Sequence, residues 1–308
     1  MNSIFKNYIK KFIEYKRSNG YDYISEEYNL KNLDQYLSSH VTELKLTKEI
    51  IHNFINNKNV KNSTKSKYAS VIREFCKYLV LFHNLDVYII DERKYPRHYD
   101  FEPYIYSDVE IMNFFKAIDL LNNDIRKKDL KLIFEFLYCT GLRISECLNI
   151  KISNIDFNNN SIKVVDTKNN LDRLIVVNDE LMNKIIKQKS NSDYLFINPY
   201  SNKPYTPDII GVQFLKILFK AKIKRHDNGP TIHSFRHTFA VKSFIKAINE
   251  KRNLNEFLPY LSTYLGHKSL ESTEKYLRLI PSELSQIRSQ VEVHDIIPNI
   301  REDNEYEK

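Results

Sequence analysis

Long apolar runs are absent from this sequence of 308 residues. No segment approaches the roughly 18 consecutive apolar residues that a membrane-spanning helix needs, so we expect no such span. The first seven residues, MNSIFKN, lack the apolar core of a secretory signal. With 42% apolar residues the chain can still bury a core, and its length suits two domains.

Cysteine is also scarce, since the chain holds only Cys76, Cys139 and Cys147. The number is odd, and the three lie in apolar helical patterns without the spacing of metal ligands. We therefore expect reduced, buried thiols, as in a cytoplasmic protein. The sequence also contains no internal repeat and no low-complexity segment.

Basic residues outnumber acidic ones, 47 to 39, which gives a formal net charge of +8. Residues 286–308 are acidic instead, with three basic and six acidic side chains. Residues 1–285 therefore hold 44 basic and 33 acidic residues, a net charge of +11. A basic body of this kind suits a polyanion such as nucleic acid. The codon usage of an AT-rich genome is the alternative explanation, because Asn, Ile and Tyr are abundant as well.

Strand patterns are missing from the N-terminal third. Apolar residues recur at helical spacing in four segments of residues 1–90, and Thr47 is placed to cap the third helix. We interpret the aromatic stripes of these helices as core. Residues 91–106 hold two prolines and several charges without a helical period, which is typical of a connection. We therefore expect a helical domain at 1–92, a linker at 93–106, a second domain at 107–285 and a tail at 286–308.

The second domain mixes helical and strand patterns. Ser107-Asp108-Val109-Glu110 matches a capping box and restarts the helical pattern. Two short strands, Ser161–Asp166 and Arg173–Val177, flank Thr167-Lys168-Asn169-Asn170 and predict a hairpin. Other segments favour helices, at about 107–121, 127–140, 179–188, 208–221, 234–249, 254–264 and 270–277. The expected fold class is therefore mainly α with a small β-sheet or hairpin, in two domains.

Arginine and histidine recur in short motifs of this domain. Arg143 stands in Thr140-Gly141-Leu142-Arg143-Ile144-Ser145-Glu146, at a corner between two helices, where its guanidinium can bind phosphate oxygens bidentately. His233 and Arg236 lie three residues apart at a helix start and share a face. We interpret the adjacent His237 as a structural residue that points elsewhere.

A third motif, residues 265–276, places His267 and Tyr276 nine residues apart. Gly266 allows a close backbone approach beside the histidine. Zinc is disfavoured, because no third ligand stands at metal spacing and neighbouring arginines repel a cation. Each residue by itself is compatible with a structural role, and Tyr276 is one of 21 tyrosines. Together, two arginines, two histidines and a tyrosine can hold a pentavalent phosphate and attack it without metal.

The motifs T-G-L-R-x-S-E, H-x-x-R-H and L-G-H-x-S-x-x-x-T-x-x-Y, in this order, resemble the tyrosine recombinase family, which includes lambda-type phage integrases, Xer recombinases and transposon integrases. The likeness covers the catalytic half, about residues 107–280. The N-terminal helical domain is similar in architecture to the family's SAM-like core-binding domain. Phe235 replaces the commoner leucine, and Thr167 and Asn169 replace the glycines that often flank the hairpin lysine.

The resemblance implies a role for each motif residue. Arg143 and Arg236 would grip the scissile phosphate, and His267 would donate a hydrogen bond to it. Tyr276 would be the nucleophile, with His233 aiding transfer of its proton.

Further residues take supporting roles by the same resemblance. Lys168 would protonate the leaving 5′ oxygen, and Glu146 is the acidic residue of the first motif. Arg173 follows Lys168 by five residues and fits the K-x-x-x-x-R pattern, so we assign it to DNA binding. Four lysines at the start of the fourth helix are the other candidates for phosphate contact, with a solvated face as the alternative: Lys58, Lys61, Lys65 and Lys67.

The implied activity is site-specific DNA recombination through a 3′-phosphotyrosine intermediate, with no cofactor and no metal. The implied partners are double-stranded DNA, sister recombinases, and a homotetramer on synapsed DNA whose chains are monomers when free. We favour the integrase or transposase of a mobile element, because the segment between Arg236 and Leu265 is longer than in Xer-like members.

Three other functions stay open. A Xer-type enzyme would resolve chromosome or plasmid dimers, and a type IB topoisomerase would relax supercoils with the same set of residues. A DNA-binding accessory protein with a dead site is disfavoured, because every motif position is filled. The tail carries an apolar patch that would pack on a neighbouring protomer or fold back on its own domain: Val291, Val293, Ile296 and Ile297.

Overall fold

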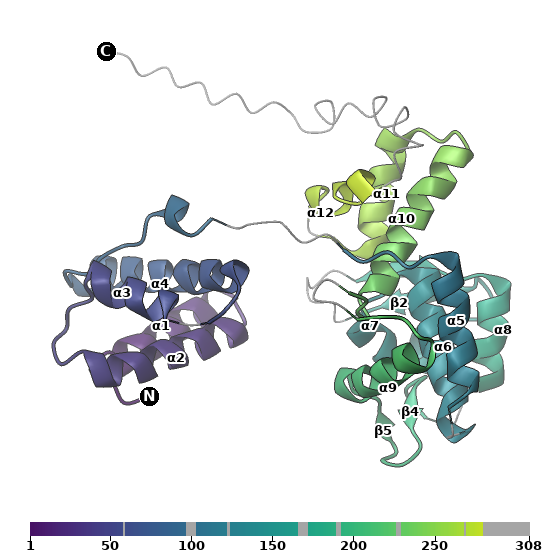
Figure 1. Ribbon diagram of the computed structural model, residues 1–308, viewed down its shortest axis with the longest axis horizontal. Helices are drawn as coiled ribbons and strands as arrows, with labels where there is room; N and C mark the ends of the chain where they lie inside the picture. Colours follow the sequence, from purple (N-terminus) through teal and green to yellow (C-terminus); the bar gives the residue numbers. More distant parts are fainter. Residues whose placement is uncertain are drawn as a thin grey trace. The chain divides into compact units, whose positions relative to one another are not determined.

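Two compact units, Met1–Phe101 and Glu102–Lys308, make up the chain in the computed structural model drawn in Figure 1. The structure describes residues 1–57, 59–96, 103–121, 124–165, 172–188, 192–225, 229–267 and 269–279. Helices dominate these residues, and two small antiparallel sheets lie in the second unit, so the predicted fold class is confirmed. No described helix is both long enough and apolar enough to cross a bilayer.

The described part of the first unit is a bundle of α1 (Lys6–Ser18), α2 (Ile24–His40), α3 (Lys48–Asn56) and α4 (Asn62–His83). Helix α4 packs against the other three. Aromatic residues at helical spacing face inward, and Phe12, Phe54 and Phe75 are buried. The hydroxyl of Thr47 accepts the N–H of Ile50 and caps α3, as the sequence predicts.

The predicted linker, residues 93–106, is too long, because both of its ends belong to folded units. Tyr95 packs on the core of the first unit, with its hydroxyl 2.7 Å from Nδ1 of His52. Tyr106 is buried in the second unit, and its backbone N–H donates to Oγ1 of Thr238 at 2.9 Å. Single aromatic side chains anchor both ends, and a single residue leaves no periodic signal in the sequence.

Helices of the second unit surround a small sheet (Figure 1). Strands β1 (Ile155–Asp156), β2 (Ser161–Val164) and β3 (Arg173–Val176) pair antiparallel in that order, with Val164 opposite Arg173. Strands β4 (Ile197–Asn198) and β5 (Lys203–Pro204) form a second pair. The helices are α5 (Asp108–Asp119), α6 (Asp124–Thr140), α7 (Ile144–Leu148), α8 (Asp179–Gln188), α9 (Pro207–Lys220), α10 (Ser234–Asn249), α11 (Leu254–Leu265) and α12 (Glu271–Glu274).

An aromatic cluster fixes the start of α10 against the rest of the second unit. The ring centroid of Phe235 lies 4.9 Å from that of Tyr106, 5.1 Å from Phe114 and 5.5 Å from Phe134. Phe235 is fully buried, so the exchange of the family's commoner leucine for phenylalanine keeps an apolar side chain in the core. Helix α10 also packs against α6 and α11. The histidines and the arginine around Phe235 are therefore carried on a rigid element.

Two local predictions differ from the structure. The helix expected at 270–277 ends at Glu274, and the N–H of Tyr276 donates to the Thr273 carbonyl three residues back, a tighter turn that leads into a 3₁₀ segment, Leu277–Leu279. Cys139 is exposed on the outer side of α6, whereas Cys76 and Cys147 are buried as expected. The capping box at Ser107 is confirmed.

Candidate active site

Arg143 lies at the corner between α6 and α7. The chain turns there through Gly141, whose φ of +63° a residue with a side chain rarely adopts. A Cβ at this glycine would also lie 2.5 Å from the Phe239 ring. Arg143 then serves as the N-cap residue of α7. Its guanidinium donates to the Gly266 carbonyl at 3.3 Å, which links this corner to the segment that follows α11.

Glu146 joins Arg143 to Arg173 in a buried network. Its Oε1 accepts from Nη1 of Arg143 at 2.6 Å, and Oε2 accepts from Nη2 of Arg173 at 2.8 Å. Nε of Arg173 donates to the Tyr264 carbonyl at 2.7 Å. Burial alone would raise the pKa of the Glu146 carboxyl, but the hydrogen bonds and charges of the two arginines outweigh it and lower the pKa to about 2.

The same network changes the interpretation of Arg173. We assigned it to DNA binding, yet its side chain is only 7% exposed and its guanidinium is bound to Glu146 and Tyr264. The flat face of the guanidinium also lies against Gly266, where a Cβ would approach Nη1 to 2.9 Å. Arg173 therefore positions Glu146 and the backbone of the site rather than a DNA phosphate.

Arg236, on the first turn of α10, is 1% exposed. Its Nη1 donates to the Gly141 carbonyl at 2.9 Å, and its Nη2 donates to the Leu265 carbonyl at 2.6 Å. Desolvation and the neighbouring charge of Arg143 lower its pKa to about 10, so the side chain stays cationic at neutral pH. Arg143 and Arg173 lie nearby with the single carboxylate of Glu146, so the group keeps a net positive charge that favours an anion.

Histidines occupy both sides of Arg236 along the helix. The rings of His233 and His237 meet edge to face, with centroids 4.6 Å apart. Nδ1 of His237 lies 2.9 Å from the hydroxyl of Tyr276. The prediction that His237 points away from the site is therefore wrong: residues four apart share a helix face, so His237 follows His233 into the site.

His267 and Tyr276 complete the site from the segment after α11. Nδ1 of His267 lies 2.6 Å from Oγ1 of the buried Thr273, a contact that fixes the ring. The rings of His267 and Tyr276 are nearly parallel, with centroids 6.2 Å apart. Tyr276 is 5% exposed. Burial raises the pKa of its phenol, while Arg236 and Arg143 pull it in the opposite direction.

Five of the six predicted catalytic residues therefore meet in one place: Arg143, His233, Arg236, His267 and Tyr276. The supporting Glu146 lies beside them. Lys168 and Lys58 fall outside the described residues. Lys61, Lys65 and Lys67 lie at the start of α4 in the first unit, where Lys61 and Lys67 are exposed and Lys65 is half-buried. No group of three or more His, Cys, Asp or Glu side chains within the described ranges could hold a metal ion.

We expect the second unit to lose stability as the pH falls below about 6.5. Desolvation and nearby positive charges lower the pKa values of His237 and His267 to about 3. Between about pH 6.5 and 3 these histidines are therefore protonated in the unfolded chain and neutral in the folded chain. The stabilisation is complete above pH 6.5 and declines toward pH 3, by about 1 kcal/mol per histidine at pH 5 after discounting for partial exposure. Glu146 adds a loss between about pH 4.5 and 2. Calorimetric unfolding between pH 4 and 8 measures this slope, and His237→Asn should reduce it.

We also expect Glu146→Ala to destabilise the second unit by roughly 3–5 kcal/mol, because it leaves Arg143 and Arg173 without their shared carboxylate in a buried site. Glu180→Ala is the matched control, since this exposed glutamate pairs with Lys184 at the surface and such pairs contribute about 1 kcal/mol or less. Scanning calorimetry of the full chain compares the two. Equal, small shifts in both variants would show that the network does not stabilise the fold.

The fold and the site define a class: two-domain, mostly helical proteins whose second domain brings arginines, histidines and a tyrosine together at one site. The model of the phage integrase family matches residues 109–283, more than half of the chain. The chain therefore belongs to the phage integrase family and is a tyrosine recombinase, as its motifs predict.

Individual relatives agree with this. Tyrosine recombinase XerC of Staphylococcus epidermidis (strain RP62A) is 28% identical over 245 residues, covering 76% of this chain and 77% of that protein. The fold is similar to XerH site-specific recombinase bound to palindromic difH substrate, with a TM-score of 0.65 and 19% identity over 85% of this chain and 78% of that one. It is also similar to the Tn1549 transposon integrase bound to a circular-intermediate DNA, with a TM-score of 0.64, 15% identity, and 92% and 99% of the two chains covered.

Proposed function

We propose that this recombinase cuts and rejoins duplex DNA with Tyr276 as the nucleophile and the scissile phosphate held by Arg143, Arg236, His233 and His267. The observation that carries the proposal is the neighbourhood of the Tyr276 phenol, which lies close to the guanidinium groups of Arg236 and Arg143 and whose ring faces that of His267. A phenol poised among fixed cations suits attack on an anionic phosphodiester, because charge that develops in the transition state meets groups already oriented toward it.

The two arginines suit phosphate in different ways. Each guanidinium has five N–H donors. The carbonyls of Gly141 and Leu265 occupy two of those of Arg236, and Glu146 and Gly266 occupy two of those of Arg143. The protein contacts thus fix the plane of each fork and leave other N–H groups for phosphate oxygens. Arg236 is buried and rigid, whereas Arg143 is partly open to solvent and can receive the strand.

The reaction then conserves the energy of the phosphodiester bond, because a phosphotyrosine bond replaces it. The Tyr276 oxygen displaces the 5′ oxygen from phosphorus and forms a 3′-phosphotyrosine, while Lys168 protonates the departing 5′ oxygen. The 5′-hydroxyl of another strand reverses the step, so neither nucleotide hydrolysis nor a metal ion is part of the scheme. Cleavage in EDTA should therefore match cleavage with added Mg²⁺.

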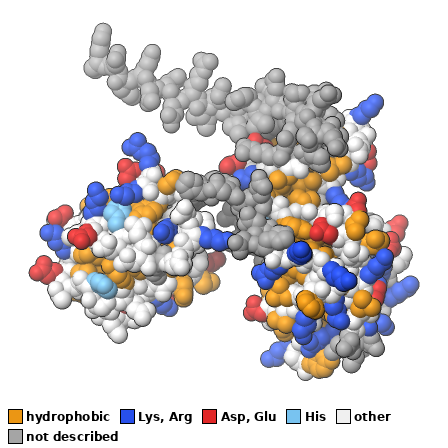
Figure 2. Space-filling model, viewed as in Figure 1, with side chains coloured by type: hydrophobic (Ala, Val, Ile, Leu, Met, Phe, Trp, Pro, Cys, Tyr) orange, Lys and Arg blue, Asp and Glu red, His pale blue; other side chains and the backbone are white. Residues whose placement is uncertain are grey.

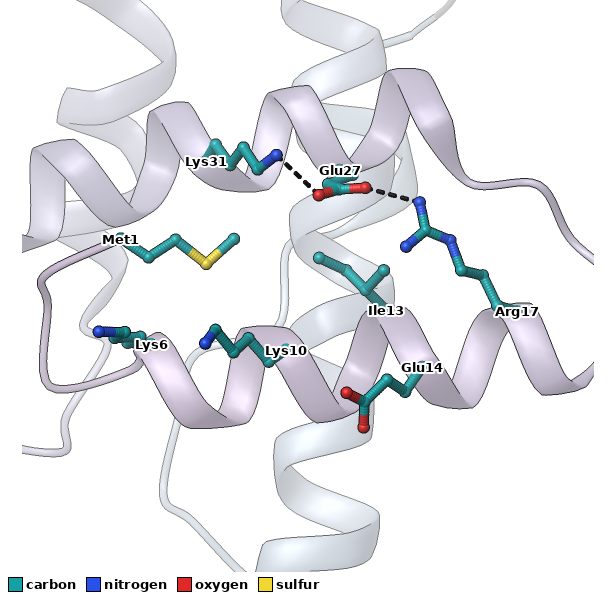
Figure 3. Close-up of a pocket in the computed structure, with 8 residues that line it drawn as sticks. All are labelled: Met1, Lys6, Lys10, Ile13, Glu14, Arg17, Glu27 and Lys31. Carbon is teal, nitrogen blue, oxygen red and sulfur yellow. Dashed lines mark hydrogen bonds and ion pairs between the residues drawn. The ribbon is translucent and has the colours of Figure 1, made fainter.

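Lys and Arg side chains lie among acidic and apolar ones on the drawn face of both units (Figure 2). Two groups of basic residues are candidate contacts for the DNA backbone. In the first unit a groove between α1 and α2 is lined by Lys6 and Lys10 on one side and Lys31 on the other, with Glu27 bridging Lys31 and Arg17 (Figure 3). In the second unit the end of α9 and the residues after it carry an exposed basic run without an acidic residue: Lys216, Lys220, Lys222, Lys224 and Arg225.

The sequence analysis does not include the α9 run among its candidates, although its five basic residues lie within ten consecutive positions, 216–225. Together with Lys61, Lys65 and Lys67, these surfaces predict affinity that falls steeply with salt, as phosphate contacts release counterions. The XerH and Tn1549 structures that this chain resembles are bound to DNA, which supports duplex DNA as the partner. A cytoplasmic location and assembly into a tetramer on synapsed DNA belong to the same proposal.

The biological role that we favour is the integrase or transposase of a mobile element, with a Xer-type resolvase as the alternative. Leu261-Ser262-Thr263-Tyr264 and the long segment before it, which forms the end of α10 and most of α11, are the residues that resemble transposon-borne integrases. The test is to incubate the protein with nicked suicide substrates made from its native locus and to sequence the trapped junctions. Junctions at the ends of an element support the integrase role, and junctions at a single chromosomal or plasmid site support the resolvase.

A further inference from the structure

His237, which is not among the predicted catalytic residues, contacts the reacting oxygen of the proposed nucleophile. Nδ1 of His237 lies 2.9 Å from the Tyr276 hydroxyl, a hydrogen-bonding distance, and the two ring centroids are 5.6 Å apart at 50°. His233, the histidine to which the family resemblance gives the proton transfer, is exposed and makes its ring contact with His237 instead. The phenol also lies beside Arg236, but a guanidinium cannot accept a proton.

The surroundings of His237 keep its imidazole neutral. His233 and Arg236 face it from the same helix, His267 from the segment after α11 and Tyr276 from the segment after α12. Desolvation and these neighbours lower the pKa of His237 to about 3 in the protein without DNA, so at neutral pH one ring nitrogen is an acceptor. The scissile phosphate brings negative charge beside the ring, which raises this pKa toward the range in which an imidazole can take a proton. Because a phenol O–H is a good donor, Nδ1 can serve as that acceptor while Nε2 keeps its hydrogen.

We infer that His237 accepts the proton of Tyr276 during DNA cleavage, an inference that rests on the proposed function. As the Oη–P bond forms, the phenol O–H bond breaks and its proton passes to Nδ1, which leaves an imidazolium. The P–O5′ bond breaks, and the 5′ oxygen takes a proton from the general acid. In religation the 5′-hydroxyl attacks phosphorus and returns its proton to the deprotonated general acid, the P–Oη bond breaks, and the imidazolium returns its proton to the phenolate.

Substitution by asparagine separates two functions of this side chain. The amide of His237→Asn places an oxygen or nitrogen where Nδ1 stands, so it can keep a hydrogen bond to the phenol without accepting a proton. His237→Ala removes both. If His237 only orients the phenol, the asparagine variant should cleave like the natural protein. If it takes the proton, both variants should be slow.

The experiment is single-turnover cleavage of a nicked suicide duplex by the full chain between pH 6 and 9.5, with half-site binding and thermal unfolding as checks on folding. We expect both variants to form the covalent adduct on the order of 10²-fold or more slowly at pH 7. Their rates should rise with pH as hydroxide takes over the proton, while the natural protein varies less. Imidazole in solution should partly restore the alanine variant.

A second substrate isolates the step. When sulfur replaces the bridging 5′ oxygen, the leaving group needs no proton, so a defect in the general acid disappears. The His237 variants should stay slow on this substrate. Restoration of their rate by sulfur, a wild-type rate for His237→Asn, or faster cleavage by His237→Ala would each overturn the inference. If the natural protein itself forms no adduct on its native sites, the proposed function fails first, and His237 is not the cause.

Discussion

Tyr276→Phe should bind a DNA half-site as tightly as the natural chain and form no covalent adduct with it. The substitution removes one oxygen from a ring that is 5% exposed and packed between His237 and His267, so the fold should be nearly unchanged. Without that oxygen no bond to phosphorus can form, and the loss of cleavage should be on the order of 10⁴-fold or more. Detergent gels of suicide-substrate reactions measure the adduct, and gel shifts measure the binding.

Tyr264→Phe is the matched control. Tyr264 is a half-buried tyrosine of the second unit, and its contribution to Arg173 comes through the backbone carbonyl, which phenylalanine keeps. Phenylalanine loses only a 3.4 Å hydrogen bond from the hydroxyl to the Val176 carbonyl. This variant should therefore retain most of its cleavage. A DNA adduct in the Tyr276→Phe protein that survives detergent would assign the nucleophile to a different side chain.

Arg236→Lys should lower cleavage by about 10²- to 10³-fold, equivalent to roughly 3–4 kcal/mol of lost transition-state stabilisation. Lysine keeps the charge but cannot hold the Gly141 and Leu265 carbonyls and still present a planar pair of donors to a phosphate. Arg236→Ala is a poorer test, because it empties a buried site and leaves both carbonyls without their donor. Arg143→Ala is the companion variant, since Arg143 is more exposed and should contribute less to folding.

Single-turnover cleavage and half-site binding distinguish the two ways in which these variants can fail. Binding should weaken only modestly, because the backbone contacts of both units remain. Cleavage at close to the natural rate in both Arg236→Lys and Arg143→Ala would place the phosphate elsewhere. A large drop in the unfolding temperature of Arg236→Lys would show that its main function is to hold Gly141 and Leu265 together.

The sequence predicts the second unit well where its signals are local. The capping box at Ser107 and the apolar periodicity around Phe114 lead to α5, and the strand alternation leads to β2 and β3. The corner that carries Arg143 follows from Gly141, whose positive φ ends one helix before the next begins. In these places the chemistry of a few neighbouring residues decides the backbone, so spacing alone is informative.

The predictions that failed depend on contacts between residues that lie far apart in the sequence. Nothing near Arg173 in the sequence indicates that Glu146, 27 residues earlier, and the Tyr264 carbonyl, 91 residues later, would bury it. The linker ends are fixed by Tyr95 and Tyr106, whose partners also lie far along the chain. His237 is the exception, because its spacing of four from His233 was visible and indicated a shared face.

The most direct test of the account is to digest the trapped DNA adduct and identify the peptide that remains linked to the DNA by mass spectrometry. We expect one modified peptide, the tryptic fragment Tyr276-Leu277-Arg278, with the 3′-phosphate of the cut strand on the oxygen of Tyr276 and a free 5′-hydroxyl on the other fragment. A linkage to any other residue, or a 5′-phosphate attached to the protein, would contradict the proposed site.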